Sequence, residues 1–371
     1  MKVGVPKEVK NHEYRVAMTP SGVHELVRGG HQVVVEHGAG TGSSIPDADF
    51  VAAGASIVPA ADDVWAAADL VLKVKEPVAE EYRRMRKGQV LFTYLHIAAS
   101  RECTDALLQA GITAIAYETV QLADGSLPLL APMSEVAGRM APQVGAHHLQ
   151  RDGGGRGVLM GGVSGVYAAK VVVLGAGVSG MSAAAIALGM QSEVLLIDKN
   201  VARLRQADAI YQGHCQTVAS NAYEIERAVL DADLVIGAVL VAGAKAPKLV
   251  SNDLVAQMKP GSVLVDISID QGGCFEDSRP TTHAEPVYKV HGSVFYCVAN
   301  MPGAVPHTST YALTNVTLPY ALELANHGWR EALRKDRALA LGLNTFDGHV
   351  TYGPVADAHG LSCVKLEEVL A

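Results

Sequence analysis

One stretch near the middle of the chain restricts the fold more than any other. Residues 170–190 read KVVVLGAGVSGMSAAAIALGM, a β-branched run, a glycine-rich turn and then an Ala-rich run of helical composition. A second apolar run follows and ends in an acid, LLID, with Asp198. Strand, tight turn, helix and second strand in this order predict a dinucleotide-binding βαβ unit.

The three glycines of the turn have separate expected roles. Gly175 permits the tight turn, Gly177 lets the backbone approach a pyrophosphate, and Gly180 lets the helix pack closely on the strand. The helix N-terminus adds the positive end of its dipole. Asp198 would accept hydrogen bonds from ribose hydroxyls and repel a 2′-phosphate, which favours NAD over NADP. The alternative, a glycine turn that binds nothing, is disfavoured by the complete context.

Hydropathy and charge exclude several classes of protein. Residues 171–192 lack charged side chains and could span a bilayer by length, but their glycines and change of composition indicate strand, turn and helix. The N-terminal MKVGVPKEVK does not resemble a signal peptide. A net charge of -8 argues against nucleic-acid binding. We therefore expect a cytoplasmic protein with no membrane or nucleic-acid partner.

The cysteines suggest neither disulfides nor zinc. The five cysteines are scattered and contain no C-x-x-C pair. We interpret them as small core residues in a reducing compartment.

The chain of 371 residues is long enough for two domains. Short apolar runs alternate with helical stretches, which predicts the α/β class: two Rossmann-like, doubly wound domains with parallel sheets and a cleft between them. Residues 1–128 plus 307–371 are expected to form a substrate domain, and residues 129–306 an inserted NAD-binding domain. The helix at 134–149 contains Pro142, which should kink it and make it a hinge.

Strand and helix bounds follow from the same patterns. Thr19-Pro20 predicts a helix start, and residues 308–310 predict a cap for a long helix that ends at Arg334. The expected strands are 2–5, 32–36, 56–59, 70–75, 89–95 and 113–117 in the first domain, and 170–174, 193–197, 234–237, 262–267 and 294–298 in the second.

Four polar side chains follow predicted strands: Lys75, His96, Glu118 and Asp270. Ligands collect at the carboxyl ends of strands in such sheets, although any one of these residues alone is better explained as a solvated loop residue. A lysine can hold a carboxylate or polarise a carbonyl, and a histidine can move protons near neutral pH. Together with a dinucleotide they fit the oxidation of a small polar acid.

The stretch VLKVKEP at 71–77 holds two lysines on one face of an expected strand. We interpret Leu72 and Val74 as core anchors, Lys73 as an outer support and Lys75 as the residue that reaches the substrate. Pro77 would end the strand.

Several long blocks make the chain similar to a known family. It resembles the alanine dehydrogenases of bacteria over essentially its whole length. The blocks are VGVPKEVKNHEYRVAMTP, LKVKEP, LFTYLHIAA, LPLLAPMSEVAGR, LGAGVSG, SIDQGG and FYCVANMPGAVPHTSTYALTN. The chain departs from the usual pattern at Pro142, and at Ser164 and Ala242, where proline is usual.

The resemblance implies site residues beyond those that the strand ends indicate. Arg15 and Lys75 would bind the substrate, with Arg15 clamping its carboxylate as a bidentate fork, and His96 and Asp270 would be the acid/base pair. Besides the motif glycines, the residues that fall where the family contacts NAD are Ser134, Val178, Ser179, Asp198, Arg203, Ser220, Val239, Leu240, Ile267, Arg279, Val298, Asn300 and Met301.

The implied reaction is the reversible oxidative deamination of L-alanine to pyruvate and ammonium, with hydride transfer to NAD, in a homohexamer. His96 would shuttle protons and Lys75 would polarise the substrate oxygen. Asp270 would orient or assist His96; the alternative is that it only caps the glycine-rich turn after it. The physiological direction and the tolerance for other amino or oxo acids stay open.

Glu323 and His327 lie four residues apart in a predicted helix and therefore on one face. Such a pair can bind a divalent ion such as Mg²⁺, but a surface hydrogen bond between the two is the commoner arrangement.

Two other functions compete with the dehydrogenase. The chain also resembles the soluble nucleotide-binding component of a proton-translocating transhydrogenase, but Arg15, Lys75 and His96 are present here. A nucleotide-sensing protein with an idle substrate site is the third reading. Saccharopine-type or lysine-forming reductases are relatives with larger substrates.

Overall fold

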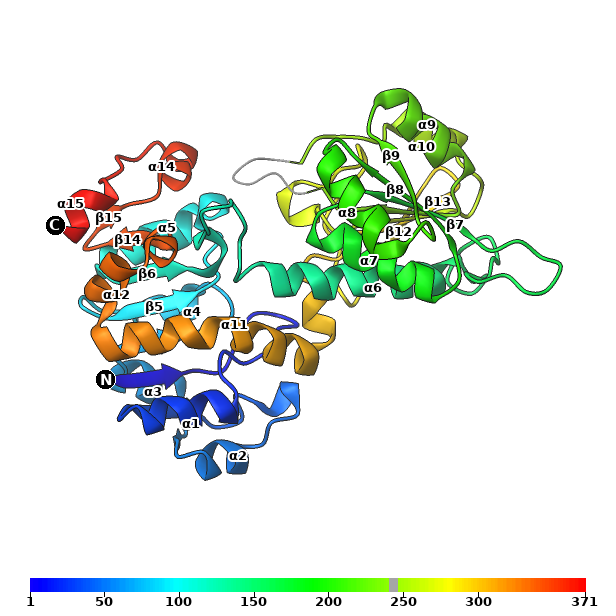
Figure 1. Ribbon diagram of the computed structural model, residues 1–371. Helices are drawn as coiled ribbons and strands as arrows, with labels where there is room; N and C mark the ends of the chain where they lie inside the picture. Colours follow the sequence, from blue (N-terminus) through cyan, green and yellow to red (C-terminus); the bar gives the residue numbers. More distant parts are fainter. Residues whose placement is uncertain (240–245) are drawn as a thin grey trace. The chain divides into compact units, whose positions relative to one another are not determined.

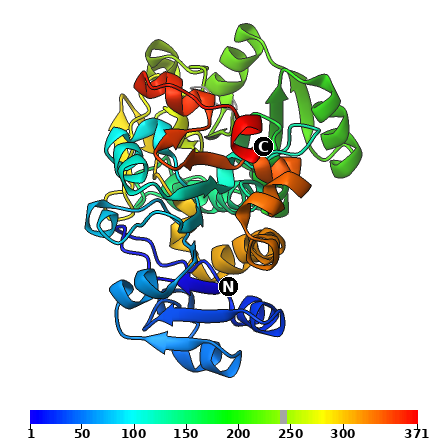
Figure 2. The ribbon, with the colours of Figure 1, turned by 90° about the vertical axis from the view of Figure 1, so that its left-hand side faces the viewer.

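The computed structural model describes residues 1–239 and 246–371. The chain forms two compact units, each an α/β arrangement, so the predicted fold class is confirmed (Figure 1). Unit 1 comprises Met1–Met133 and Val305–Ala371, and unit 2 comprises Ser134–Ala304. The sequence had placed these boundaries at 128/129 and 306/307. Both termini belong to unit 1 (Figure 2).

Unit 1 contains an eight-stranded sheet in the order β15-β14-β6-β5-β4-β1-β2-β3 among the described residues. The strands from β6 to β3 are parallel, and β14 and β15 add antiparallel pairs at one edge. Their bounds are β1 (Lys2–Val5), β2 (Gln32–Glu36), β3 (Ser56–Val58), β4 (Leu70–Leu72), β5 (Val90–Thr93), β6 (Thr113–Ala116), β14 (Leu343–Phe346) and β15 (His349–Val350).

Helices cover this sheet. They are α1 (Pro20–Arg28), α2 (Asp47–Ala52), α3 (Ala61–Ala67), α4 (Ala79–Tyr82), α5 (Arg101–Ala110), α11 (Pro306–His327), α12 (Trp329–Lys335), α13 (Arg337–Ala340), α14 (Gly353–His359) and α15 (Leu366–Leu370). The predicted start of α1 is confirmed, because the Thr19 side chain accepts a hydrogen bond from Gly22 N.

The long C-terminal helix differs from the prediction at both ends. It begins at Pro306, after Val305, with no side-chain cap, rather than after residues 308–310. It ends at His327, because Gly328 has a φ of 74° and breaks the helix before α12.

Unit 2 contains a seven-stranded sheet in the order β12-β13-β11-β10-β7-β8-β9 among the described residues. All neighbours are parallel except β12 and β13. The strands are β7 (Lys170–Leu174), β8 (Glu193–Asp198), β9 (Gln216–Ala219), β10 (Leu234–Gly237), β11 (Val263–Asp266), β12 (Val287–Val290) and β13 (Ser293–Tyr296), and the helices are α6 (Ala131–Leu149), α7 (Val178–Gly189), α8 (Val201–Tyr211), α9 (Ala222–Asp231) and α10 (Asn252–Gln257).

The central strands are buried on both faces, as parallel sheets require. Every residue of β4, β5, β6, β10 and β11 is buried. Four of the five cysteines are buried, as predicted, but Cys363 is exposed, so the prediction of a core residue is wrong there.

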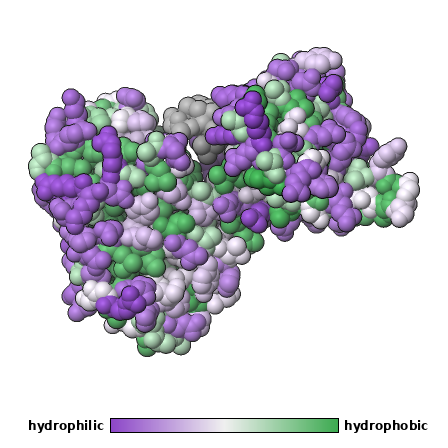
Figure 3. Space-filling model, in the orientation of Figure 1, coloured by the Kyte–Doolittle hydropathy of each residue, from purple (hydrophilic) through white to green (hydrophobic). Residues whose placement is uncertain are grey.

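The loop at residues 158–168, between α6 and β7, exposes several large apolar side chains. Leu159, Val163 and Val166 are 62–64% exposed, and Tyr167 is 95% exposed. Figure 3 shows apolar residues at the tip of this loop, whereas hydrophilic residues cover much of the rest of the visible face. In the described part of the chain, none of the helices has the length and apolar character needed to cross a membrane.

Candidate functional site

The predicted catalytic residues of unit 1 follow adjacent parallel strands. Arg15 lies in the loop after β1, Lys75 after β4 and His96 after β5, and Glu118 lies in the 3₁₀ turn (Tyr117–Thr119) after β6. The strand order is β6-β5-β4-β1, so the carboxyl ends of these strands lie along one edge of the sheet. The topology therefore gathers the four residues where ligands bind in such folds.

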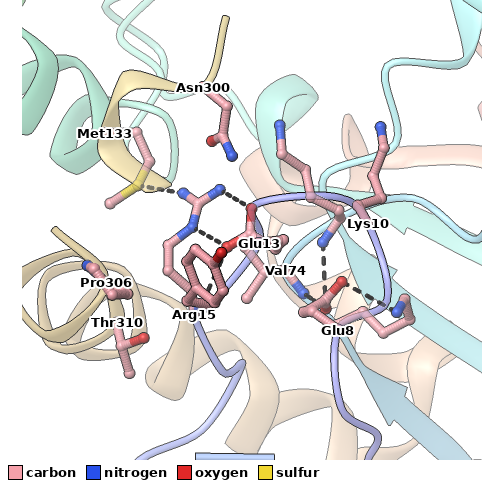
Figure 4. A network of polar contacts seen from close by, with 12 residues as sticks. Glu8, Lys10, Glu13, Arg15, Val74, Met133, Asn300, Pro306 and Thr310 are labelled. Atoms are coloured by element: carbon pink, nitrogen blue, oxygen red, sulfur yellow. Dashed lines mark hydrogen bonds and ion pairs between the residues drawn. The ribbon is translucent and has the colours of Figure 1, made fainter. Parts of the chain in front are cut away.

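Arg15 is buried and paired with Glu13 (Figure 4). Its Nε donates to Oε1 of Glu13 at 2.7 Å, its Nη2 donates to Oε2 at 2.5 Å, and its Nη1 lies 3.0 Å from the Met133 sulfur. Burial raises the pKa of Glu13, but the hydrogen bond and the charge of Arg15 outweigh burial and lower this pKa to about 2. Glu13 therefore occupies the Nε edge of the guanidinium, and a substrate carboxylate cannot form a fork with that edge while this pair is intact.

The backbone on both sides of Arg15 is also fixed. Val16 N donates to the Thr310 hydroxyl at 3.1 Å, and the Ser43 hydroxyl donates to the Tyr14 carbonyl at 3.0 Å. The two hydroxyls lie 2.7 Å apart and are hydrogen-bonded. These bonds join the loop of Arg15 to α11, which is distant in sequence.

The two lysines of VLKVKEP occupy different environments. Lys73 is completely buried, with Nζ 2.9 Å from Glu81 Oε1 and 3.2 Å from Glu8 Oε2, so the prediction of an outer support is wrong. Burial lowers the pKa of Lys73, but Glu8 and Glu81 outweigh it and raise the pKa to about 12. Lys75 is only half-buried.

Glu8 also fixes the backbone that leads to Lys75. Its Oε1 accepts hydrogen bonds from Val74 N at 2.6 Å and from Lys75 N at 3.4 Å. Figure 4 shows Glu8 beside Val74. The buried Lys73 therefore supports Lys75 indirectly, because it holds the carboxylate that positions the next two residues.

His96 presents an exposed ring on a constrained backbone. Its side chain is 42% exposed, and its ring is stacked 5.9 Å from that of Tyr94, whose hydroxyl donates to Leu129 O at 2.6 Å. Its φ is 47°, the left-handed region that residues other than glycine rarely adopt. Glu118 accepts hydrogen bonds from the backbone N–H groups of Leu95 and His96.

In unit 2, the glycine motif has the geometry that the sequence predicted. Gly175 directly follows β7 with a φ of 107°, and an added Cβ would lie 2.6 Å from Ala238 O. A Cβ on Gly180 would lie 1.7 Å from Gly175 O. Among residues 1–239 and 246–371, a Cβ on Gly177 would meet only Arg203 Nη1, at 4.0 Å. Contacts with the described residues therefore account for Gly175 and Gly180 but not for Gly177, where the described part of the chain leaves room for a ligand.

Asp198 ends β8 beside this loop. Its Oδ2 accepts from Ala176 N at 2.6 Å, its Oδ1 accepts from Asn200 N at 2.7 Å, and Arg203 Nη1 lies 4.0 Å from Oδ2. The side chain is 8% exposed. Two backbone N–H groups thus orient the carboxylate next to the N-terminus of α7.

Asp270 is exposed in a 3₁₀ turn (Ile269–Gln271) after β11. The buried carboxylate of Asp266 holds this loop at both ends, because it accepts from Ser268 N and from Cys274 N, each at 2.9 Å. Backbone carbonyls accept the N–H bonds of Gly272 and Gly273. The contacts among the described residues therefore do not support the alternative that Asp270 caps the turn.

Of the other residues predicted to contact NAD, several follow strands of the same sheet and the rest lie in helices, in a 3₁₀ turn or in a loop. Ser220 follows β9, Val239 follows β10, Ile267 follows β11, and Val298 and Asn300 follow β13. Ser134 lies in α6, Val178 and Ser179 begin α7, Arg203 lies in α8, Met301 begins a 3₁₀ turn (Met301–Ala304), and the Arg279 guanidinium lies 4.0 Å from the Tyr288 ring centroid. Leu240 and Ala242 lie outside the described residues.

The two residues predicted as a metal pair lie in contact on the surface of α11. His327 Nε2 lies 3.5 Å from Glu323 Oε2 on α11, and both side chains are exposed. No group of three or more His, Cys, Asp or Glu side chains that could hold a metal ion occurs among residues 1–239 and 246–371.

Comparison with known proteins identifies the family. Residues 4–137 match the description "Alanine dehydrogenase/PNT, N-terminal domain", and residues 141–353 match "Alanine dehydrogenase/PNT, C-terminal domain". The chain belongs to the alanine dehydrogenase/PNT family. It is 65% identical to the alanine dehydrogenase of Mycobacterium tuberculosis (strain ATCC 25618 / H37Rv) over 371 residues, which cover 100% of each chain.

Two solved structures resemble nearly the whole chain. An L-alanine dehydrogenase superposes with a TM-score of 0.94 at 52% identity, covering 97% of this chain and 99% of the other. A transhydrogenase from Sinorhizobium meliloti superposes with a TM-score of 0.81 at 28% identity, covering 95% and 99%. The resemblance noticed in the sequence is therefore confirmed.

Sequence reasoning missed the acids that support the predicted site of this family member. Glu8, Glu13 and Asp266 were not singled out, and Glu118 was noticed only as a strand-end residue. Each accepts a hydrogen bond from backbone next to a predicted catalytic residue or its loop. In the sequence, these residues are visible only as acids close to strand ends. Such acids are too common to show which of them hold the backbone of a catalytic residue.

Proposed function

We propose that this chain catalyses the NAD-dependent, reversible oxidative deamination of L-alanine to pyruvate and ammonium. The full-length 65% identity to an alanine dehydrogenase supports this most strongly. The site adds chemical support, because Arg15, Lys75 and His96 follow adjacent strands of one sheet. We propose unit 1 as the substrate domain and unit 2 as the NAD-binding domain.

The residues of unit 2 fit NAD. The open space above Gly177 would admit the pyrophosphate to the N-terminus of α7, and Asp198 would select the unphosphorylated ribose. The remaining predicted contact residues would hold the ribose and nicotinamide portions. When bound, NAD accepts the hydride that leaves the alanine Cα.

In unit 1, the cations orient the substrate. Arg15 would pair with the substrate carboxylate through the part of its guanidinium that Glu13 does not occupy. The predicted fork would have to use the Nη1 side of the guanidinium, since the Nε edge is already paired with Glu13. Lys75 would hold the oxygen of the intermediate, on the backbone that Glu8 fixes.

His96 would transfer protons when water attacks the imine and when ammonia leaves, since an imidazole can both accept and donate a proton near neutral pH. The exposure of its ring is consistent with a residue that exchanges protons. Asp270 is exposed on the loop that Asp266 holds, and its acid/base role stays a prediction from the family resemblance.

The similarity to a transhydrogenase defines the competing function. The test is to incubate the purified chain with NAD and L-alanine, and separately with a reduced and an oxidised nucleotide without alanine. The dehydrogenase predicts NADH formation that depends on alanine. Hydride exchange between nucleotides, with no response to alanine, would favour the transhydrogenase role.

We also propose a cytoplasmic homohexamer. The exposed Val163, Val166 and Tyr167 support association, because such side chains gain from being covered. Light scattering tests the assembly. A Mg²⁺ ion on Glu323 and His327 stays a weak proposal, because Mg²⁺ prefers oxygen ligands and this pair supplies one carboxylate and one imidazole.

A further inference from the structure

Glu118 bonds the end of strand β5 at the point where the chain turns into His96. Its Oε1 accepts from His96 N at 2.6 Å and from Leu95 N at 3.1 Å, and its Oε2 lies 3.2 Å from Leu95 N. The side chain is only 15% exposed. A largely buried carboxylate is therefore committed to two consecutive backbone N–H groups.

The conformation of His96 makes these bonds important. A φ of 47° is costly for a residue with a Cβ and persists only where the surroundings impose it. The N–H that Glu118 accepts is that of the strained residue itself. Charge-assisted bonds to backbone N–H groups are stronger than neutral ones, so this carboxylate can offset the strain.

The ring of His96 is held less firmly than its backbone. It is 42% exposed, its contact with Tyr94 is a stack at 5.9 Å, and its Nδ1 is 4.0 Å from Glu118 Oε1, which is too far for a hydrogen bond. The backbone conformation therefore decides the direction in which the imidazole leaves the sheet.

We propose that Glu118 is the positioning residue for His96: it holds the left-handed turn at the end of β5 and thereby aims the imidazole. The proposal deepens the proposed function and rests on it for its catalytic consequence. Glu118 itself does not transfer a proton in this account. Its effect comes through the backbone of His96.

The test compares Glu118→Ala and Glu118→Gln. Alanine removes both acceptors, whereas glutamine can place its one carbonyl oxygen where Oε1 accepts from His96 N. Misplacement of a catalytic group by about 1 Å can cost on the order of 100-fold in rate. We expect Glu118→Ala to lower kcat by about that factor with a much smaller change in KM for alanine, and Glu118→Gln to restore kcat to within about tenfold of the wild type.

A matched control is Asp69→Ala. Asp69 also accepts a backbone hydrogen bond, from Lys2 N at 2.9 Å. It directly precedes β4, however, and so lies at the amino ends of the parallel strands, away from His96. The control should leave kcat unchanged. NADH binding, measured by fluorescence titration, should keep the same stoichiometry in all variants, which separates misplacement of His96 from loss of folded protein.

Crystal structures of the wild type and Glu118→Ala provide a readout that does not depend on activity. The proposal predicts that His96 leaves the positive-φ conformation in the alanine variant. An unmoved His96, an unchanged kcat in Glu118→Ala, or a glutamine variant as slow as the alanine variant would overturn it. Movement of His96 together with a wild type that is inactive on alanine would instead refute the proposed function and retain the positioning role.

Discussion

Arg15 and Glu13 form a buried ion pair two residues apart in sequence, in which Glu13 accepts from the Arg15 backbone N–H at 3.1 Å as well as from its guanidinium. The Glu13 carboxylate thus holds both the backbone N–H and the guanidinium of Arg15. The pair explains how a charged side chain that is 1% exposed keeps a defined direction at the edge of the sheet.

This pair predicts how stability depends on acidity. Burial raises and Arg15 lowers the pKa of Glu13, and the net value falls from 4.5 to about 2. The stabilisation is therefore complete above the unfolded pKa of 4.5 and is lost as the pH falls toward 2. Glu13→Gln should lower the free energy of unfolding by about 3–5 kcal/mol at neutral pH. On acidification, the free energy of unfolding of this variant should fall less than that of the wild type. Denaturant unfolding across this pH range measures both effects.

The exposed Glu102, at the start of α5, provides the control for this experiment. Glu102→Gln should reproduce the acid dependence of the wild type. An acid dependence in Glu13→Gln equal to that of the wild type would show that the ion pair does not contribute in this way.

The two lysines of VLKVKEP provide a second comparison, between stability and catalysis. Lys73→Met leaves Glu8 and Glu81 buried without their cation, so it should destabilise the fold by about 3–5 kcal/mol. Lys75→Met should unfold near the wild-type midpoint but lose about 100-fold or more in kcat/KM, as expected for removal of a group that stabilises developing charge. Thermal unfolding and steady-state kinetics on both variants decide the matter. A Lys73→Met variant that is stable but inactive, with a Lys75→Met variant that is unstable but active, would contradict these roles.

Asp198 predicts the choice of nucleotide. Its carboxylate lies beside the glycine loop, and Arg203 is 4.0 Å away. Asp198→Ala should weaken binding of NAD, because the ribose loses its acceptor, and should improve binding of NADP, because Arg203 can then face a 2′-phosphate. Titration calorimetry with both nucleotides tests this. If the ratio of the two affinities did not change, Asp198 would not be the selecting residue.

Much of the fold could be predicted from the sequence because buried parallel strands are continuous apolar runs. The strands at 2–5, 32–36, 170–174 and 234–237 have the predicted bounds. The strands β9, β12, β14 and β15 were missed, since Gln216–Ala219 and Val287–Val290 lie at or near sheet edges and mix polar with apolar residues. Edge strands are not buried on both faces, so their sequences lack the continuous apolar run that predicts a central strand.

The environments of Lys73 and Lys75 could not be predicted for a different reason. The alternation rule for side chains applies only within a strand, and β4 ends at Leu72 rather than at Lys75. Which lysine is buried then depends on Glu8 and Glu81, contacts that appear only in the folded structure.

The most direct test of the account follows the hydrogen on the alanine Cα. The purified chain is supplied with NAD and L-alanine deuterated at Cα, and the reduced nucleotide and pyruvate are analysed by mass spectrometry. For the proposed dehydrogenase, the deuterium should be recovered in the reduced nucleotide, and Lys75→Met and His96→Ala should suppress its transfer without abolishing nucleotide binding. Reduced nucleotide without deuterium, or none formed in the presence of alanine, would contradict it.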